Sequence, residues 1–229
     1  MKNSKHEEDI GLIKDLMEKS SKFSNLSGIA VIATGFLAIV GASLIYFDIG
    51  ISISEIHISY AELINQTANP DSLLIKLKLL ISIASLILLS SLVLLYVTAK
   101  IKSGKEGIKL FNSTFSRTLK SLFVPLFSGG VFCLFLLYHH MYGLVAPATL
   151  IFYGLGLVSA SKYSYSELEF LGYFELVLGI LASYYMGSGL LFWIIGFGLG
   201  HIIFGLFIHF KYDQKLSLIH ISEPTRPVP

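Results

Sequence analysis

Two ionisable residues in long apolar runs, Glu175 and His201, have side chains that could carry chemistry. An ionisable group in hydrocarbon costs on the order of 3 kcal/mol or more, so it usually faces the interior of a helical bundle and has a partner. Glu175 lies 12 residues before Gly187, and His201 lies 14 residues after it. Because a helix rises about 1.5 Å per residue, a turn at Gly187 would place both side chains at similar depth. The spacing therefore predicts an intramembrane polar pair.

Two interpretations of this pair are open. A carboxylate facing an imidazole can hold a proton that exchanges near neutral pH, which would make the pair a proton or cation site. Alternatively, the two side chains form a structural hydrogen bond between helices, typically worth around 1 kcal/mol. The sequence also allows the two helices to rotate the side chains apart. The structural hydrogen bond is the default interpretation, since intramembrane polar pairs often serve only to hold helices together.

No other set of residues predicts a metal site, a cofactor site or a catalytic site. His139 and His140 point about 100° apart on a helix, and further ligands would have to come from Glu55 or His57, so we interpret them as interfacial residues of an aromatic belt. Cys133 is the single cysteine, which excludes a disulfide within the chain and a cysteine-based metal site. The chain has no Walker, HExxH, GxSxG or dinucleotide-binding motif. We expect no metal, no cofactor and no enzymatic activity.

Glycines in the apolar runs indicate close helix packing. Gly196 and Gly200 are four residues apart, so they share one face of a helix and allow a neighbour to approach closely. The segment Phe197-Gly198-Leu199-Gly200 matches Tyr153-Gly154-Leu155-Gly156 at an offset of 44 residues, a faint repeat that suggests duplicated hairpins. We assign Gly196, Gly200, Gly154 and Gly156 to packing within one chain, with homo-oligomer contacts as the alternative.

The elements that carry these residues are transmembrane helices. The chain is 54% hydrophobic and only 14% charged, against roughly 25% charged residues in soluble domains. A helix needs about 20 apolar residues to cross the hydrocarbon core. Pro125 and the pair Gly129-Gly130 can kink or interrupt the third helix. We predict an all-α polytopic bundle of six helices near residues 26–47, 79–98, 119–139, 143–161, 168–186 and 189–209.

Basic residues predict the orientation, because short loops rich in lysine and arginine stay in the cytoplasm. With six spans, nearly all native basic residues fall on one side, and only Lys76 and Lys78 fall on the other. Both ends of the chain are therefore predicted to lie in the cytoplasm. The basic residues on that side are Lys2, Lys5, Lys14, Lys19, Lys22, Lys100, Lys102, Lys105, Lys109, Arg117, Lys120, Lys162, Lys211 and Lys215.

The chain divides into three parts. Residues 1–23 form a cytoplasmic amphipathic segment, since Ile10, Ile13, Leu16 and Met17 recur at helical spacing. Residues 24–215 form the six-helix transmembrane domain, whose first loop alternates from residue 51 to residue 60 as an extended strand does. Residues 216–229 contain LSLIHISEPTR, which resembles a translated sequencing adapter. We treat this tail as non-native and expect the natural C-terminus to be missing.

The segments GLVAPATLIFYGLGLVSASKY and GSGLLFWIIGFGLGHIIFG, with KDLMEKSSKF near the beginning, resemble an uncharacterised family of small six-helix bacterial inner-membrane proteins. The resemblance implies a bacterial cytoplasmic membrane and brings no activity or site residue. We expect a non-enzymatic sensor or interaction module. The alternative is a small proton- or cation-coupled transporter that uses Glu175 and His201, and an intramembrane enzyme is a distant third interpretation. The expected partners are the lipid bilayer, with a cytoplasmic protein at the N-terminal helix and a second copy of the chain as open alternatives, and no nucleic acid.

Overall fold

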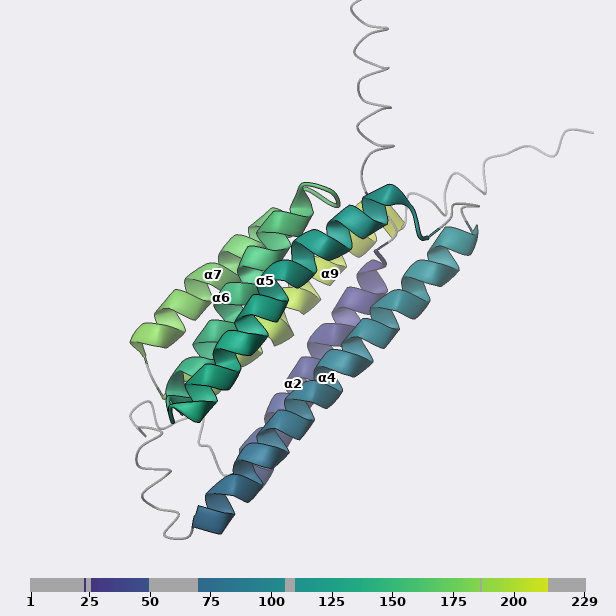
Figure 1. Cartoon of the computed structure of the whole chain (residues 1–229). Helices are drawn as coiled ribbons and strands as arrows, with labels where there is room; N and C mark the ends of the chain where they lie inside the picture. Colours follow the sequence, from purple (N-terminus) through teal and green to yellow (C-terminus); the bar gives the residue numbers. More distant parts are fainter. Residues whose placement is uncertain (1–22, 24–25, 50–69, 106–109, 186, 214–229) are drawn as a thin grey trace, which may run out of the picture.

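The described residues of the chain are all helical outside their turns. The computed structural model describes residues 23, 26–49, 70–105, 110–185 and 187–213. Within these residues the predicted all-α bundle of six helices is confirmed (Figure 1). The first five helices are α2 (Gly28–Ile49), α4 (Pro70–Lys105), α5 (Ser113–Tyr138), α6 (Val145–Ser161, preceded by the 3-10 turn η1, Tyr142–Leu144) and α7 (Leu168–Tyr184). The last helix consists of α8 (Gly189–Trp193), the π-helix η2 (Ile194–Gly200), α9 (His201–Ile208) and the π-helix η3 (His209–Asp213).

The protein is a multi-pass membrane protein. Among the described residues, five helices are long and apolar enough to cross a membrane: Gly28–Phe47, Lys78–Lys105, Ser113–Tyr138, Tyr142–Ser161 and Gly189–Asp213. The sixth, α7, has 17 residues, which is at the lower limit for a span. It lies along α6, and its Gly172 and Gly179 contact Gly154 and Ile151 there. The predicted spans agree with these helices to within a few residues, with two exceptions. α4 begins 9 residues earlier, at Pro70, and ends later, at Lys105, and α5 begins 6 residues earlier, at Ser113.

The helices form two groups of three. The first helix group contains α5, α6 and α7, with α6 between the other two, and the second contains α2, α4 and the last helix, with α2 between the other two (Figure 1). Glycines bring backbones into direct contact inside each group. A Cβ at Gly154 would lie 2.7 Å from the carbonyl oxygen of Gly172, and a Cβ at Gly35 would lie 2.6 Å from that of Gly198. The absence of side chains at these positions therefore sets how closely the helices pack.

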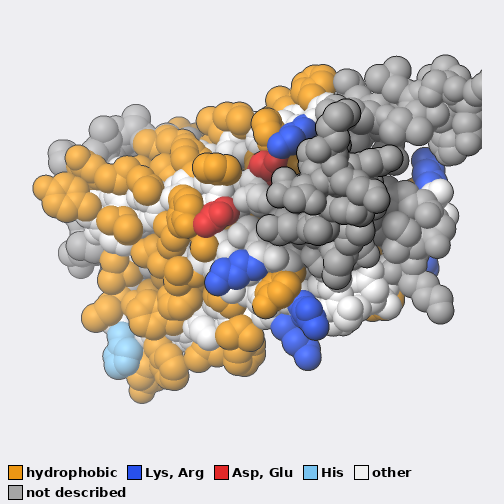
Figure 2. All heavy atoms as spheres, turned by 90° about the horizontal axis from the view of Figure 1, so that it is seen from above, with side chains coloured by type: hydrophobic (Ala, Val, Ile, Leu, Met, Phe, Trp, Pro, Cys, Tyr) orange, Lys and Arg blue, Asp and Glu red, His pale blue; other side chains and the backbone are white. Residues whose placement is uncertain are grey.

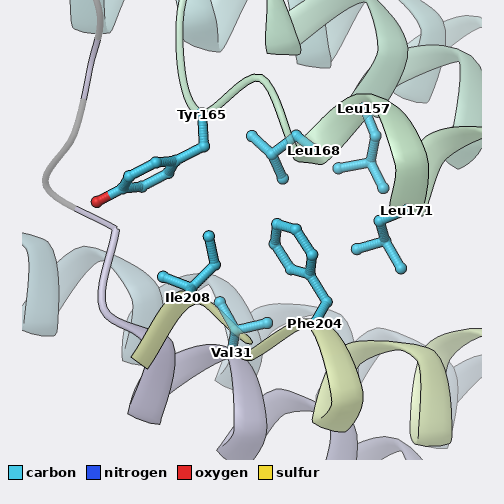
Figure 3. Close-up of a cluster of buried hydrophobic side chains, with 7 residues drawn as sticks. All are labelled: Val31, Leu157, Tyr165, Leu168, Leu171, Phe204 and Ile208. Atoms are coloured by element: carbon cyan, nitrogen blue, oxygen red, sulfur yellow. The ribbon is translucent and has the colours of Figure 1, made fainter. Parts of the chain in front are cut away.

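A buried apolar cluster joins the two helix groups near one end of the bundle. Val31 from α2 and Phe204 and Ile208 from α9 point toward Leu157 from α6 and Leu171 from α7 (Figure 3). Tyr165 and Leu168 complete the cluster at the connection between α6 and α7. Since Ile208 is fully buried, the contact between the groups is a packed core rather than a loose surface.

Most of the described basic residues gather at this same end of the bundle, whereas Lys76 and Lys78 lie near the beginning of α4, at the other end. The end of α4, the beginning of α5, the end of α6 and the end of the last helix meet there, as shown by a hydrogen bond from Thr118 Oγ1 to the Tyr163 carbonyl (3.1 Å) and an ion pair between Lys102 and Asp213 (3.0 Å). Figure 2 looks onto this face and shows Lys and Arg side chains beside the apolar surface. We call it the basic end; its described basic residues are Lys100, Lys102, Lys105, Arg117, Lys120, Lys162 and Lys211.

Several predictions concern the remaining parts of the chain. The amphipathic N-terminal helix, the extended strand of residues 51–60 and the adapter-derived tail of residues 216–229 lie outside the described residues. α5 is helical from beginning to end. Neither Pro125 nor the pair Gly129-Gly130 interrupts it.

Candidate functional site

Glu175 lies in the middle of α7 and faces the last helix. Its side chain has no exposed surface, and both of its carboxyl oxygens lack a hydrogen-bond partner among the described residues. The space that the carboxyl group occupies exists because residue 196 is glycine. A Cβ at Gly196 would lie 3.1 Å from Glu175 Cδ, would collide with Oε2, and would lie 2.8 Å from Leu150 Cδ2. Gly196 is therefore part of the site, as the residue that leaves room for the carboxyl group.

A π-helical segment positions the partner of Glu175. Residues 194–200 form the π-helix η2, which ends directly before His201. Such segments are rare and are frequent at functional sites, because the extra residue per turn changes the direction of the side chains that follow. The imidazole of His201 folds back along this segment, and its Nδ1 lies 3.2 Å from the carbonyl oxygen of Gly196. The π-helix thus supplies a backbone acceptor for the ring.

The structure brings Glu175 and His201 together. Nδ1 of His201 lies 3.6 Å from Oε1 of Glu175, and the two side chains are 8% and 0% exposed. This distance is too long for a hydrogen bond and is short enough for an ion pair if both groups were charged. On the other side of the ring, Nε2 lies 2.6 Å from the hydroxyl of Tyr153 on α6. The imidazole is thus held on both sides, while the carboxyl group beside it is not.

Aromatic rings enclose the imidazole. The ring of Tyr153 stacks on His201 at a centroid distance of 5.4 Å and an interplanar angle of 28°. Phe197 also stacks on it, at 5.9 Å and 24°, and lies 5.0 Å from Tyr153. These contacts fix the plane of the imidazole and cover it with apolar surface. The sequence analysis missed Tyr153, although a hydroxyl-bearing ring in the middle of a span, aligned with Phe197 by the faint repeat, was a usable signal.

The arrangement can bind and release a proton. An ionised carboxylate that is buried without a donor is costly, so the neutral acid is the form that fits the present geometry. If the acid lost its proton, the nearest group able to donate a hydrogen bond would be Nδ1 of His201, 3.6 Å away. A displacement of well under 1 Å would close this gap to hydrogen-bond distance. The two protonation states of the pair therefore favour different distances between the carboxyl group on α7 and the ring on the last helix.

The other glycines assigned to packing lie at contacts between helices of the chain. A Cβ at Gly200 would lie 3.0 Å from Phe174 of α7, and one at Gly156 would lie 2.8 Å from Leu126 of α5. Gly154 contacts the backbone of α7 at Gly172. Each glycine thus has a neighbour in the same chain that accounts for its small size.

The two adjacent histidines are at the end of the bundle opposite the basic end. His139 is exposed, and Nδ1 of His140 lies 2.6 Å from the hydroxyl of Tyr142. Among the described residues, no group of three or more His, Cys, Asp or Glu side chains is placed to hold a metal ion. The single cysteine, Cys133, is buried between α5 and α6.

A second polar cluster, which the sequence analysis also missed, closes the basic end. Asp213 at the end of the last helix accepts a hydrogen bond from the backbone N–H of Gly28 (2.9 Å), so it caps α2 from 185 residues away. The ammonium group of Lys102 on α4 binds Asp213 (3.0 Å) and donates to the carbonyl oxygen of Leu26 (3.2 Å). We call these residues the Asp213 cluster. It ties together the three helices of the second helix group.

Glu167 connects the two helix groups at the basic end. It lies just before α7 and accepts hydrogen bonds from Lys211 and from the hydroxyl of Tyr212 (2.8 Å) on the last helix. Partial burial on its own would raise the pKa of Glu167, but the hydrogen bonds, with the charge of Lys211, outweigh it and hold the pKa below its ordinary value. The carboxylate is therefore charged near neutral pH and holds the groups together.

Comparison with family models, with curated proteins and with solved structures gave no match to this chain.

Proposed function

We propose that the protein is a non-enzymatic, proton-responsive membrane module in which protonation of Glu175 controls how the two helix groups pack. One observation carries this proposal: both carboxyl oxygens of Glu175 are buried without a hydrogen-bond partner among the described residues, 3.6 Å from an imidazole. A carboxyl group that only held two helices together would be expected to make the hydrogen bond that gives such pairs their stability. Within the described part of the chain, Glu175 makes no such bond.

The position of the pair connects protonation with the arrangement of the helices. Glu175 belongs to the first helix group and His201 to the second. A negative charge on Glu175 would attract the Nδ1 side of the ring, and the electrostatic term is large in a site from which water is excluded. Protonation would remove that attraction. A change of charge on Glu175 would therefore alter the contact between the two helix groups. A sensor of proton concentration requires such a coupling between protonation and structure.

A second candidate function is proton- or cation-coupled transport through the same site. The observation that favours it is the location of Glu175 and His201 between two three-helix groups, since substrate and coupling-ion sites of transporters lie between units that move against each other. In this alternative, the bonds from Lys211 and Tyr212 to Glu167 hold the two helix groups together at the basic end. The two candidates share the proton and differ in whether a solute crosses.

The proposed location is a bacterial cytoplasmic membrane, with the basic end in the cytoplasm. The distribution of described basic residues and the sequence resemblance to bacterial inner-membrane proteins support this orientation. The lipid bilayer is the main partner, and the basic end is the face available to a cytoplasmic protein. Reporter fusions test the orientation: a fusion within residues 106–109 should report the cytoplasm and one at His139 the opposite side. Reports from a single compartment would overturn the proposed orientation.

Infrared difference spectroscopy of the protein in lipid tests the proton site. As the pH is changed, we expect a carboxylic-acid C=O band to appear and disappear together with small changes in the amide bands. The band should be missing in Glu175→Gln. It should remain in the control Glu169→Gln, which changes a carboxylate of the same helix that accepts a hydrogen bond from Tyr173 (2.6 Å). A pH-dependent spectrum identical in wild type and Glu175→Gln would refute the proposal.

Flux measurements distinguish the two candidate functions. The protein is reconstituted into liposomes that carry a pH-sensitive dye, and a proton gradient is applied with and without candidate cations. A sensor gives the infrared response without proton flux. A transporter gives flux that Glu175→Gln abolishes and Glu169→Gln retains.

A further inference from the structure

We infer that Tyr153 is a positioning residue, whose hydroxyl determines which nitrogen of His201 carries the hydrogen atom and so directs an N–H toward Glu175. The inference rests on two hydrogen bonds of the imidazole, one with the Tyr153 hydroxyl and one with the Gly196 carbonyl oxygen, and on the 3.6 Å between Nδ1 and Glu175 Oε1. It deepens the proposed function, because it names the residue that prepares His201 to receive an ionised Glu175.

The two neighbours of the ring determine its tautomer. A backbone carbonyl can only accept a hydrogen bond, so the contact between Nδ1 and the Gly196 oxygen (3.2 Å) requires the hydrogen on Nδ1. In a neutral imidazole the other nitrogen is then an acceptor. The hydroxyl of Tyr153, 2.6 Å from Nε2, must therefore be the donor. In the opposite tautomer, the lone pair of Nδ1 would face the Gly196 carbonyl oxygen, which cannot donate a hydrogen bond.

Two titratable side chains of the described residues face the imidazole of His201. Among the described residues, the titratable groups against His201 are Glu175 from α7 and Tyr153 from α6, and the remaining ring contact is the phenyl group of Phe197. Tyr153 is held in place by stacking on His201 and by a tilted ring contact with Phe197. Its hydroxyl is thus presented to Nε2 at a short and well-defined distance. A phenylalanine at residue 153 would keep the stacking and lose only the donor.

As a consequence, His201 presents an N–H donor toward Glu175 before Glu175 loses its proton. With Nε2 engaged by Tyr153, the hydrogen on Nδ1 lies on the side of the ring that faces Oε1 of Glu175, at 3.6 Å. When Glu175 loses its proton, Nδ1–H can donate to the carboxylate without a ring flip or a tautomer change. Without the Tyr153 hydroxyl, part of the population would place the hydrogen on Nε2, and the ionised carboxylate would meet a lone pair.

Nitrogen-15 NMR of histidine-labelled protein in lipid tests the inference. The chain has seven histidines, so the His201 signals are assigned by their loss in His201→Gln. We expect wild-type His201 at neutral pH to carry its hydrogen on Nδ1. In Tyr153→Phe, the ratio of the Nδ1–H form to the Nε2–H form should fall at least about fivefold, which corresponds to the loss of one ordinary hydrogen bond. The control Tyr173→Phe removes the hydroxyl that binds Glu169 on the lipid-facing side of α7 and should leave the ratio unchanged.

Two results would overturn the inference. The first is the finding that His201 of the wild-type protein carries its hydrogen on Nε2. This measurement requires no variant, so it remains decisive if Tyr153→Phe fails to fold. The second is an unchanged tautomer ratio in folded Tyr153→Phe. The tautomer is measured at constant pH and does not depend on whether Glu175 exchanges its proton. A positive NMR result beside an infrared spectrum without a Glu175 band would therefore refute the proposed function and leave the role of Tyr153 intact.

Discussion

Gly196→Ala should disrupt the site by filling the space that Glu175 occupies. The added Cβ would lie 2.8 Å from Leu150 Cδ2 and 3.1 Å from Glu175 Cδ, and it would collide with Oε2. Both side chains are fully buried, so neither can move into lipid. Overpacking of this kind costs about 1–3 kcal/mol, partly offset by the higher helix propensity of alanine, up to about 1 kcal/mol. The carboxyl group must tilt away from the last helix, and the pair with His201 must open.

The matched control is Gly130→Ala in α5. A Cβ at Gly130 would meet no described atom within 4 Å, so only the gain in helix propensity remains. Unfolding by SDS titration in mixed micelles should therefore place Gly196→Ala below Gly130→Ala by about 1–3 kcal/mol. The infrared band of Glu175 should shift in the first variant only. Equal stability of the two variants, with an unshifted band, would show that the last helix does not approach Glu175 as described.

Three further predictions concern stability. Because the pKa of Glu167 is lowered in the folded protein, its contribution to the free energy of unfolding should be complete above about pH 4.5 and should be lost as the pH falls below that value. Glu167→Gln should remove this pH dependence. A free energy of unfolding that falls with acid equally in wild type and Glu167→Gln would contradict the prediction. Asp213→Ala should lower the free energy of unfolding by about 0.5–2 kcal/mol, the usual effect of losing a helix cap, and should accelerate hydrogen exchange at the N–H of Gly28. Asp213→Asn keeps an acceptor oxygen and should lower the free energy of unfolding less. Equal exchange rates in wild type and both variants would exclude the cap. Gly187→Ala should destabilise the protein by about 1 kcal/mol or more, because the φ of 118° at Gly187 is unfavourable for residues with a Cβ, and an unchanged SDS unfolding midpoint would argue against that turn.

The helices, and the similar depth of Glu175 and His201 in the membrane, could be predicted from the sequence because both depend on local patterns. Apolar runs of about 20 residues predict spans, since backbone amides must be satisfied internally in hydrocarbon. Counting residues outward from Gly187 then placed Glu175 and His201 at similar depth. Similar depth says nothing about rotation, however. The π-helix before His201 changes the direction of that side chain, and its run of glycines reads as ordinary packing in the sequence.

The contacts that the sequence did not reveal join residues far apart in the chain. Asp213 caps Gly28 across 185 residues, and neither residue carries a local signal for the other. The faint repeat pairs α7 with the last helix as a hairpin, whereas α7 packs most extensively against α6. That preference rests on the mutual contact of Gly154 and Gly172, which depends on how the two helices are rotated. Long-range pairing of this kind is a property of the assembled bundle.

The backbone contact between α2 and the last helix also has a consequence for biosynthesis. Gly35 contacts Gly198, and a Cβ at Gly205 would lie 2.8 Å from the carbonyl oxygen of Gly28. α2 thus meets the helix that it packs against most extensively only after residues 189–213 have been made, and until then α2 and α4 remain in the lipid or beside the insertion machinery. Nascent chains stalled before residue 189 should therefore remain sensitive to membrane proteases, and resistance should appear only once the last helix has been released.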